Sequence, residues 1–132
     1  LCAAVADYRP SVMADKKIKR EKTGEMTLTL VPNPDIAAAL GKIKRENQVN
    51  VGFALETNDE ATNAKDKCAR KNFDFIVMNS LKDKGAGFQV DTNKITIFTA
   101  GGDVMEYPLK TKKEVAADIV DAVVEIAKKK GL

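Results

Sequence analysis

The chain has 132 residues, and its contents of 44% hydrophobic and 31% charged residues are typical of one globular domain. Its net charge of +3 is too small to indicate a nucleic-acid partner, and an aromatic content of 5% without Trp argues against base-stacking surfaces. The chain contains no His, which excludes Ser-His-Asp and Cys-His catalysis, zincin sites and His-ligated haem. The sequence has no apolar run of the ~20 residues that a membrane span needs, so no membrane association is expected.

The two cysteines, Cys2 and Cys68, are too few for a disulfide framework. We therefore expect a reducing, cytoplasmic setting in which both thiols are buried as small apolar groups. Residues 1–6 form a continuous apolar run, which is typical of a buried strand in a parallel sheet. Because nothing solvating precedes this run, the chain is interpreted as part of a longer protein, with residues 1–132 as a single domain.

The first third of the chain predicts two strands, a loop and a helix. The first strand should end at Pro10, because Pro lacks the amide that a ladder needs. Residues 11–23 are polar and basic and predict a mobile loop. Residues 26–30 alternate apolar and polar side chains, as half-buried strands do. Asn33 is expected to cap a helix that begins at Pro34 and carries an apolar stripe of Ile36, Leu40 and Ile43.

The remainder predicts alternating strands and helices. Strands are expected at residues 49–55 and 73–78, and a glycine turn predicts a hairpin of residues 94–99 and 104–109. Capping boxes predict helix starts at Thr57 and at Thr111. Helical spacing predicts the inward-facing residues, which are Ala61, Ala64 and Cys68 in the first helix and Val115, Ile119, Val123 and Ile126 in the second. Gly131 should end the last helix, after three lysines that suit its dipole.

This order of elements predicts the fold class. Strand, helix and strand in series indicate an α/β, Rossmann-like three-layer fold with a mainly parallel sheet. A C-terminal β-hairpin and helix would complete it. Ligands of such folds bind at the carboxyl ends of the strands. That rule points to the segments after Ala6, Phe53 and Met78.

Two helical features suit an anion such as a nucleotide phosphate. The helix start at residues 33–36 offers free backbone amides. Lys67 and Lys71 are four residues apart on one helix, where they repel each other unless an anion lies between them. The alternatives are simple capping of the helix and two lysines whose stems lie along the apolar stripe.

Two further features point to the same chemistry. Lys17 and Lys19 lie on the basic loop, from which a lysine could close over a reacting phosphate. Asp7, at the end of the first strand, could hold Mg²⁺ or a ribose. The alternatives are a solvated run of charges and an Asp that forms a turn. The common placement of all four features is what favours a nucleotide site.

An ordered set of short motifs runs through the chain, at residues 3–10, 17–19, 30–36, 51–57, 70–74, 78–79 and 87–88. In this order and spacing they resemble phosphopantothenoylcysteine synthetase, the synthetase half of the bacterial bifunctional coenzyme A biosynthesis flavoprotein. The resemblance implies ligation of 4′-phosphopantothenate with cysteine through an acyl-cytidylate formed from CTP, accompanied by Mg²⁺. It also implies a homodimer with a contact near residues 26–30. A non-catalytic nucleotide-binding or dimerisation module of a larger flavoprotein is the alternative.

The resemblance also assigns roles to residues. Lys17 corresponds to the essential lysine of the closing loop, and Asp7 to an aspartate that binds nucleotide and Mg²⁺. Ala3 and Ala4 correspond to the strand end that contacts phosphopantothenate. The implied CTP-binding residues are Asp7, Lys17, Pro34, Asp35, Ile36, Ala37, Phe53, Lys67 and Lys71. The upstream glycine-rich βα unit and the FMN-binding decarboxylase domain of the family are absent, so this chain alone is not expected to need FMN or to be active by itself.

Overall fold

A computed structural model describes residues 5–19, 24, 26–56, 60–80 and 90–132. The chain divides into two units, Leu1–Ile36 and Ala37–Leu132, and each is described by itself. The assignment of residues 1–132 to a single domain stays a prediction. Among the described residues, no helix combines the length and apolar character that crossing a membrane requires.

The first unit is built around an antiparallel pair of strands. β1 (Tyr8–Pro10) pairs with β2 (Leu30–Pro32), with Tyr8 opposite Pro32 and Pro10 opposite Leu30. Pro10 is the last residue of β1, so the strand ends where the sequence predicts. Pro10 still pairs with Leu30, which a two-stranded sheet tolerates because alternate amides face solvent. Of the expected buried strand at residues 1–6, residues 1–4 lie outside the described residues, whereas Val5 and Ala6 are exposed and precede β1.

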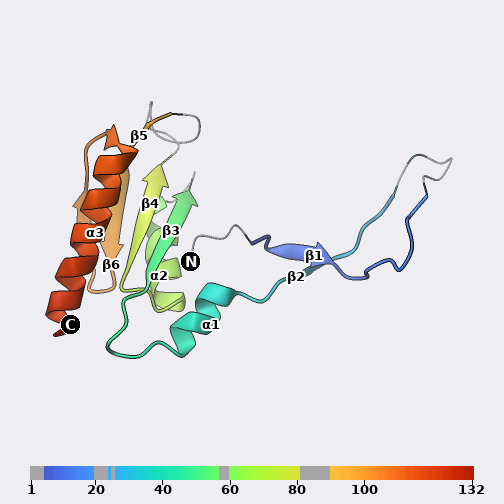
Figure 1. The fold of residues 1–132 in the computed structure, drawn as a ribbon, viewed down its shortest axis with the longest axis horizontal. Coiled ribbons are helices and arrows are strands. Elements are labelled where there is room, and N and C mark those ends of the chain that lie inside the picture. Colours follow the sequence, from blue (N-terminus) through green and yellow to red (C-terminus); the bar gives the residue numbers. More distant parts are fainter. Residues whose placement is uncertain (1–4, 20–23, 25, 57–59, 81–89) are drawn as a thin grey trace. The chain divides into compact units, whose positions relative to one another are not determined.

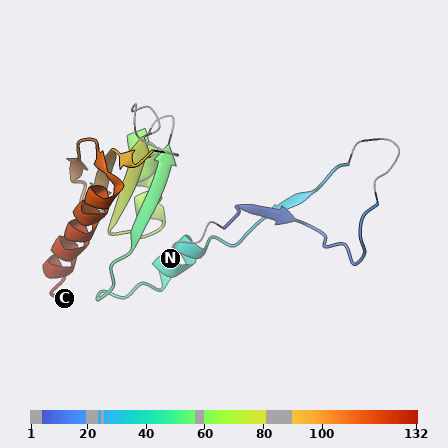
Figure 2. The ribbon, with the colours of Figure 1, turned by 45° about the horizontal axis from the view of Figure 1, so that its top comes forward.

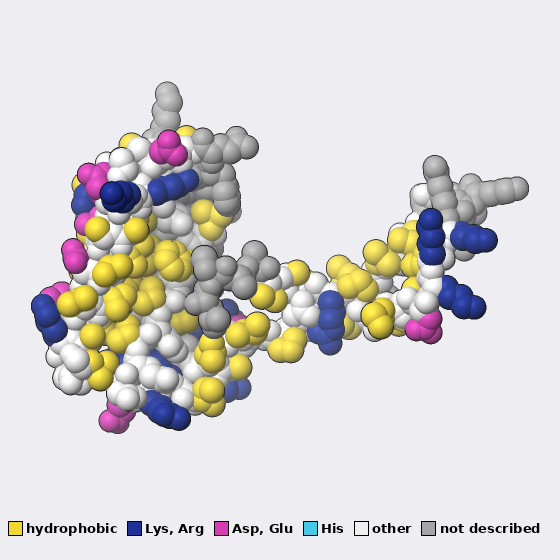
Figure 3. All heavy atoms as spheres, viewed as in Figure 1, with side chains coloured by type: hydrophobic (Ala, Val, Ile, Leu, Met, Phe, Trp, Pro, Cys, Tyr) yellow, Lys and Arg dark blue, Asp and Glu magenta, His cyan; other side chains and the backbone are white. Residues whose placement is uncertain are grey.

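The predicted half-buried strand at residues 26–30 is wrong in position and burial. The strand begins at Leu30, and Met26 and Leu28 are 65% and 55% exposed. The alternation of apolar side chains is present in the sequence, but no described element of this unit covers them. Figure 3 shows exposed apolar side chains along the part of the first unit that contains β1 and β2.

The second unit is a three-layer α/β arrangement, which confirms the predicted fold class (Figures 1 and 2). Its main sheet has the order β3 (Val51–Glu56), β4 (Phe75–Ser80), β6 (Ile95–Thr99) and β7 (Val104–Glu106). The β3–β4 pair is parallel and the other two pairs are antiparallel. β5 (Thr92–Asn93) and β8 (Lys110–Thr111) form a separate short pair, and the helices are α1 (Ile36–Lys42), α2 (Glu60–Arg70) and α3 (Lys112–Lys129).

Alternate residues of β4 fill two cores. Phe75 and Val77 pack with Val115 on the α3 side, whereas Ile76 and Met78 belong to the core on the α2 side. The two helices thus cover opposite faces of the sheet, as Figures 1 and 2 show. The predicted stripe of α3 is confirmed, since Val115, Ile119, Val123 and Ile126 all pack in that core. In α2, Ala64 and Cys68 are buried as predicted, but Ala61 is exposed.

Both ends of α3 follow the sequence signals. The Thr111 hydroxyl accepts from the Glu114 amide at 3.3 Å, and the Glu114 carboxylate accepts from the Thr111 amide at 2.9 Å. At the other end, Gly131 has a φ of 74° and the Leu132 amide donates to the Ala127 carbonyl. This is the Schellman arrangement that glycine favours. The second predicted capping box involves Thr57, which lies outside the described residues.

Helix α1 begins later than predicted. Its first residue is Ile36, so Asp35 and not Asn33 precedes it. Asn33 instead serves the first unit, where its side chain accepts from Arg9 at 3.0 Å and donates to the Ala6 carbonyl at 2.6 Å. The predicted apolar stripe is also wrong, since Leu40 and Ile43 are exposed.

Small residues bring α1 against the end of α2. Gly41 is buried, and a side chain there would collide with the backbone carbonyl of Lys71. The Asn72 side chain donates to the Gly41 carbonyl at 2.9 Å, and Ala37 packs against the α2-side core. Helix α1 therefore packs through Ala37 and Gly41, because only small residues permit so close an approach of two backbones.

A buried carboxylate joins the segments at the amino ends of β3 and β4. Asp74 is 8% exposed, and its two oxygens accept from Lys44 at 3.0 Å and Lys130 at 2.7 Å. The amide of Asn50 donates to it at 2.7 Å. Burial would raise the pKa of Asp74, but the hydrogen bonds from Lys130, Asn50 and Lys44 outweigh that effect and hold the pKa below its usual value.

Replacing this carboxylate should be costly. We expect Asp74→Asn to lower the free energy of unfolding by about 3 kcal/mol, because two lysines lose their counter-ion. That corresponds to a fall in Tm of roughly 10 °C. Since the pKa is lowered in the folded state, the carboxylate stabilises the wild type above the unfolded pKa of about 4 and loses this contribution as pH falls further.

Thermal unfolding between pH 7 and pH 3 measures both effects. The Asp74→Asn variant should lose less stability on acidification than the wild type. Asp103→Asn, at an exposed carboxylate of the β6–β7 turn, is the control. Equal Tm values for Asp74→Asn and Asp103→Asn at pH 7 would contradict the assignment of Asp74 as a structural counter-ion.

Candidate functional site: a basic hollow on helix α2

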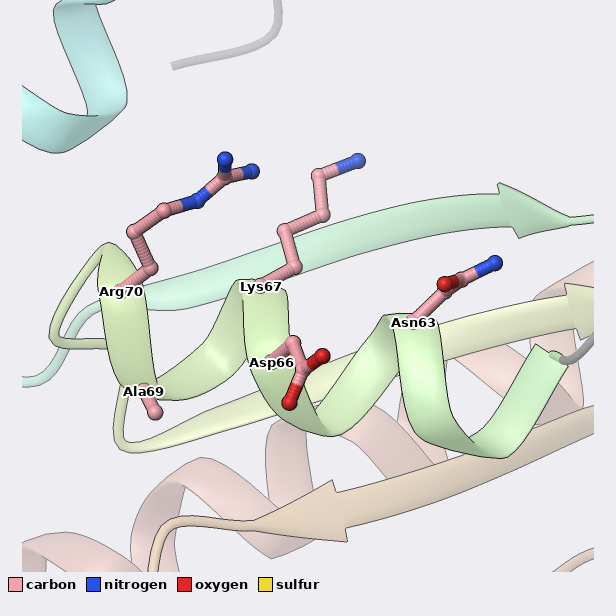
Figure 4. A pocket seen from close by; sticks show the side chains of 5 residues that line it. All are labelled: Asn63, Asp66, Lys67, Ala69 and Arg70. Atoms are coloured by element: carbon pink, nitrogen blue, oxygen red, sulfur yellow. The ribbon is translucent and has the colours of Figure 1, made fainter.

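Helix α2 borders an open hollow of about 640 Å³. The described residues that line it come from this helix: Asn63, Asp66, Lys67, Ala69 and Arg70. Figure 4 shows the side chains of Asn63, Lys67 and Arg70 extending to the same side of the helix, with Asp66 and Ala69 turned away from them. The hollow thus offers two cations and one amide on one side and a carboxylate at its margin.

The spacing of these residues explains why they gather. Asn63, Lys67 and Arg70 are separated by four and three positions, which places them on one face of an α-helix. The opposite face carries Ala64 and Cys68, which are 0% and 3% exposed in the core. Because the apolar face of α2 is buried against the sheet, the face that carries Asn63, Lys67 and Arg70 points away from the sheet.

The charges of the hollow are not neutralised by ion pairs in the part of the chain that the structure describes. Lys67 is half-buried and Arg70 is exposed, and no salt bridge involves either of them there. Lys65 lies on the same helix but its ammonium group is 5.8 Å from the centre of the Phe98 ring. Such an arrangement of unpaired cations can bind an anionic group of a ligand.

Only one of the two lysines predicted on this helix lines the hollow. Lys67 does so, whereas Lys71 follows the last residue of α2 and is not part of the lining. The Lys71 amide donates to the Lys67 carbonyl at 3.1 Å, so the two residues share the final turn. Sequence analysis missed Arg70 and Asn63, although their helical spacing from Lys67 was a usable signal.

Phe53 lies on a different face. It is 58% exposed on β3, opposite Val77 of β4, which belongs to the α3-side core. Residues paired in neighbouring strands point to the same side of a sheet, so Phe53 lies on the α3 side, whereas α2 covers the other side. The structure therefore does not bring Phe53 and Lys67 onto one face, and a shared role stays a prediction.

Several predicted residues belong to the first unit. Asp7, Lys17, Pro34, Asp35 and Ile36 are exposed there. The Asp7 carbonyl accepts from the Asn33 amide at 2.8 Å, which extends the antiparallel pairing beyond Tyr8 and Pro32. Ala37 belongs to the second unit and is partly buried. Ala3 and Ala4 lie outside the described residues.

The arrangement of the described acidic side chains limits which kind of Mg²⁺ site they could form. Within the described ranges, no three or more Asp, Glu or Cys side chains are grouped so that they could hold a metal ion. A single carboxylate such as Asp7 suits Mg²⁺ that arrives with phosphate oxygens, because this ion keeps waters and phosphates as its other ligands. The described acidic residues therefore fit a metal that arrives with a nucleotide better than a metal held by these side chains alone.

The carboxyl ends of the parallel strands, predicted as a ligand edge, are described only in part. Asn79, near the end of β4, accepts a hydrogen bond from the Asn93 side chain at 3.0 Å. The segments 57–59 and 81–89 lie outside the described residues. Cys68 is buried as predicted, and burial raises the pKa of its thiol, so it is a poor nucleophile. Cys2 lies outside the described residues.

The fold and the hollow define an α/β protein with a candidate anion-binding helix. The chain belongs to the family described as DNA/pantothenate metabolism flavoprotein C-terminal domain, which matches residues 1–127. This confirms the family expected from the sequence motifs.

Relatives agree with this membership. A protein named cysteine/cysteine sulfinic acid decarboxylase, from an unknown prokaryotic organism, is 56% identical over 96% of this chain and 35% of its own length. The coenzyme A biosynthesis bifunctional protein CoaBC of Bacillus subtilis is 43% identical over 98% of this chain and 31% of its own length. The chain thus spans about a third of these curated relatives.

A solved structure confirms the fold. The crystal structure of the C-terminal domain of coenzyme A biosynthesis bifunctional protein CoaBC superposes with a TM-score of 0.72 at 32% identity. The match covers 96% of this chain and 53% of that chain. The fold of the present chain is therefore that of part of a CoaBC C-terminal domain.

Proposed function

We propose that the chain is part of an enzyme of coenzyme A biosynthesis that ligates 4′-phosphopantothenate with cysteine. CTP would activate the carboxylate as an acyl-cytidylate with release of pyrophosphate, and the cysteine amine would then displace CMP. The observation that carries this proposal is the relation to CoaBC over almost the entire chain. The basic hollow on α2 supports it, since the reaction needs cations near phosphates.

The proposal assigns roles within each unit. In the second unit, Lys67 and Lys71 would contact the nucleotide, with Phe53 beside the base and Ala37 at the helix start. In the first unit, Lys17 would offset negative charge during cytidylate formation, and Asp7, Pro34, Asp35 and Ile36 would contact CTP, with Asp7 also facing Mg²⁺. Ala3 and Ala4 would contact phosphopantothenate.

The nucleotide preference can be measured by thermal unfolding. With Mg²⁺ present, CTP should raise the Tm by several degrees at a hundredfold excess over Kd, where binding stabilises by ~2.7 kcal/mol. ATP and UTP serve as controls of equal charge. Equal shifts with all three nucleotides, in the chain and in the longer protein that contains it, would contradict CTP specificity.

The role of Lys17 can be separated from binding. In the full-length protein we expect Lys17→Ala to reduce CTP-dependent pyrophosphate release by at least about a hundredfold, because a developing charge loses its counter-charge. CTP binding should change less than turnover. Lys19→Ala, two residues away and also exposed, is the matched control. Pyrophosphate release that is unchanged in Lys17→Ala would remove this role.

A second function is supported by one observation. The relative at 56% identity is named as a decarboxylase and not as a ligase. In a protein of that kind this chain would be a non-catalytic nucleotide-binding or dimerisation module, and FMN would belong to another domain. The two functions differ in pyrophosphate release: the full-length protein releases it from CTP only if the ligase function is correct.

We also propose that the protein forms a homodimer through the first unit. An isolated two-stranded sheet is marginally stable, and apolar side chains of this unit are exposed at Val12, Met13, Ile18, Met26, Leu28 and Leu30. A second copy with the same surface would cover them symmetrically. A cytoplasmic location stays a prediction.

Size-exclusion chromatography with light scattering tests the dimer. The wild type should elute at twice the chain mass, and Met26→Glu with Leu28→Glu should shift it toward the monomer, because two charges would enter an apolar contact. Thr27→Glu with Thr29→Glu is the control, since these exposed neighbours are already polar. A monomeric wild type, or equal behaviour of both double variants, would contradict this dimer surface.

A further inference from the structure

Lys67 and Arg70 are the two cations among the described residues that line the hollow, and the proposed function gives a role to Lys67 but none to Arg70. We propose that Arg70 binds the diphosphate part of a nucleotide in the hollow on α2, together with Lys67 and opposed by Asp66. The inference rests on the proposed function for the identity of the nucleotide, but not for the anion-binding chemistry itself.

The geometry gives Arg70 a better position than Lys71. Arg70 lines the hollow, three residues after Lys67, and its side chain extends to the same side as those of Lys67 and Asn63 (Figure 4). Lys71 does not line it. Lys67 and Arg70 repel each other across one helical turn. An anion bound between them would remove this repulsion and would also form new contacts with both side chains.

The chemistry of the two side chains suits a polyphosphate. A guanidinium group presents paired donors that match two phosphate oxygens, and it stays charged at every physiological pH. A lysine adds a mobile point charge. Asn63, one turn before Lys67, is neutral and adds no further repulsion. Two cations about one turn apart fit a group with two adjacent negative charges better than a single carboxylate.

Asp66 makes the proposal testable in both directions. It lines the same hollow but carries the opposite charge, and no salt bridge within the described residues neutralises it. If the ligand is an anion, Asp66 weakens its binding. If the ligand is an amine or a metal ion, Asp66 holds it. Removing this charge therefore gives effects of opposite sign for the two classes of ligand.

The experiment uses inorganic pyrophosphate as the probe, with calorimetry on the full-length protein at low and at physiological ionic strength. Arg70→Gln should weaken pyrophosphate binding about tenfold, the effect of losing one charge-assisted contact at an exposed site. Lys65→Gln removes the same charge from the same helix, but from a side chain directed to the Phe98 ring, and should change binding less than twofold. Asp66→Asn should strengthen binding severalfold.

Three results would overturn the inference. These are no pyrophosphate binding by the wild type, equal losses in Arg70→Gln and Lys65→Gln, and weaker binding in Asp66→Asn. Equal losses would show that only the general charge of the helix acts, which salt screens. Circular dichroism of each variant identifies any loss that reflects unfolding, and Arg70→Lys should then recover part of the binding, since it restores the charge without the paired donors.

Different measurements test the anion site and the proposed ligase function. Pyrophosphate reports on the hollow without a base or a reaction, whereas CTP selectivity and cytidylate formation report on the ligase. If Arg70→Gln loses pyrophosphate binding while CTP and ATP bind alike and no cytidylate forms, the hollow is an anion site and the ligase function fails. If cytidylate forms at wild-type rates in Arg70→Gln, the ligase stands and Arg70 has no part in it.

Discussion

The arrangement of the second unit depends on one buried carboxylate. Asp74 precedes β4, and its contacts reach Lys44 after α1, Asn50 before β3 and Lys130 at the end of α3. Its backbone adds two more links, since its amide donates to the Asn50 carbonyl and its carbonyl accepts from Ala100. A charge so placed is unfavourable unless all its partners are present. The structure at the amino ends of the strands therefore depends on four separate segments, which contain Lys44, Asn50, Ala100 and Lys130.

This anchoring determines how α2 is presented. The segment between α2 and Asp74 is short, and within it Asn72 adopts a φ of 51° and donates to the Gly41 carbonyl. The end of α2 is thus held between the ion cluster and α1, while Ala64 and Cys68 fix its rotation against the sheet. The outward direction of Lys67 and Arg70 is a consequence of these contacts and needs no ligand to establish it.

Local signals predicted those features that depend on local chemistry. The capping box at Thr111, the glycine at 131 and the stripe of α3 were predictable because each involves neighbours within one or two turns. The three-layer class followed from the order of strands and helices. The predicted strand at residues 26–30 failed because alternation shows which side chains share a face, not what covers that face.

In the candidate site, too, local sequence signals predicted some residues and contacts but not others. The spacing of Lys67 and Lys71 predicted Lys67 but not Arg70, although Arg70 lies three residues after Lys67 on the same helix. The partnership of Lys130 with Asp74 could not be predicted, since it joins residues 56 positions apart. From the sequence, Lys130 was assigned only to the end of a helix, whereas the structure gives it a buried counter-ion.

The exposure of the hollow limits what α2 can contribute to catalysis. Cations that face solvent are screened and hold a phosphate weakly, and their attraction does not depend on which base the nucleotide carries. Selection of CTP over other nucleotides must therefore come from groups outside this helix. Strong stabilisation of a reacting phosphate also requires water to be excluded, which an open hollow lined by one helix does not achieve. The proposed ligase thus needs a further element that excludes water from the nucleotide, which is the role that the family resemblance implies for a closing loop carrying Lys17.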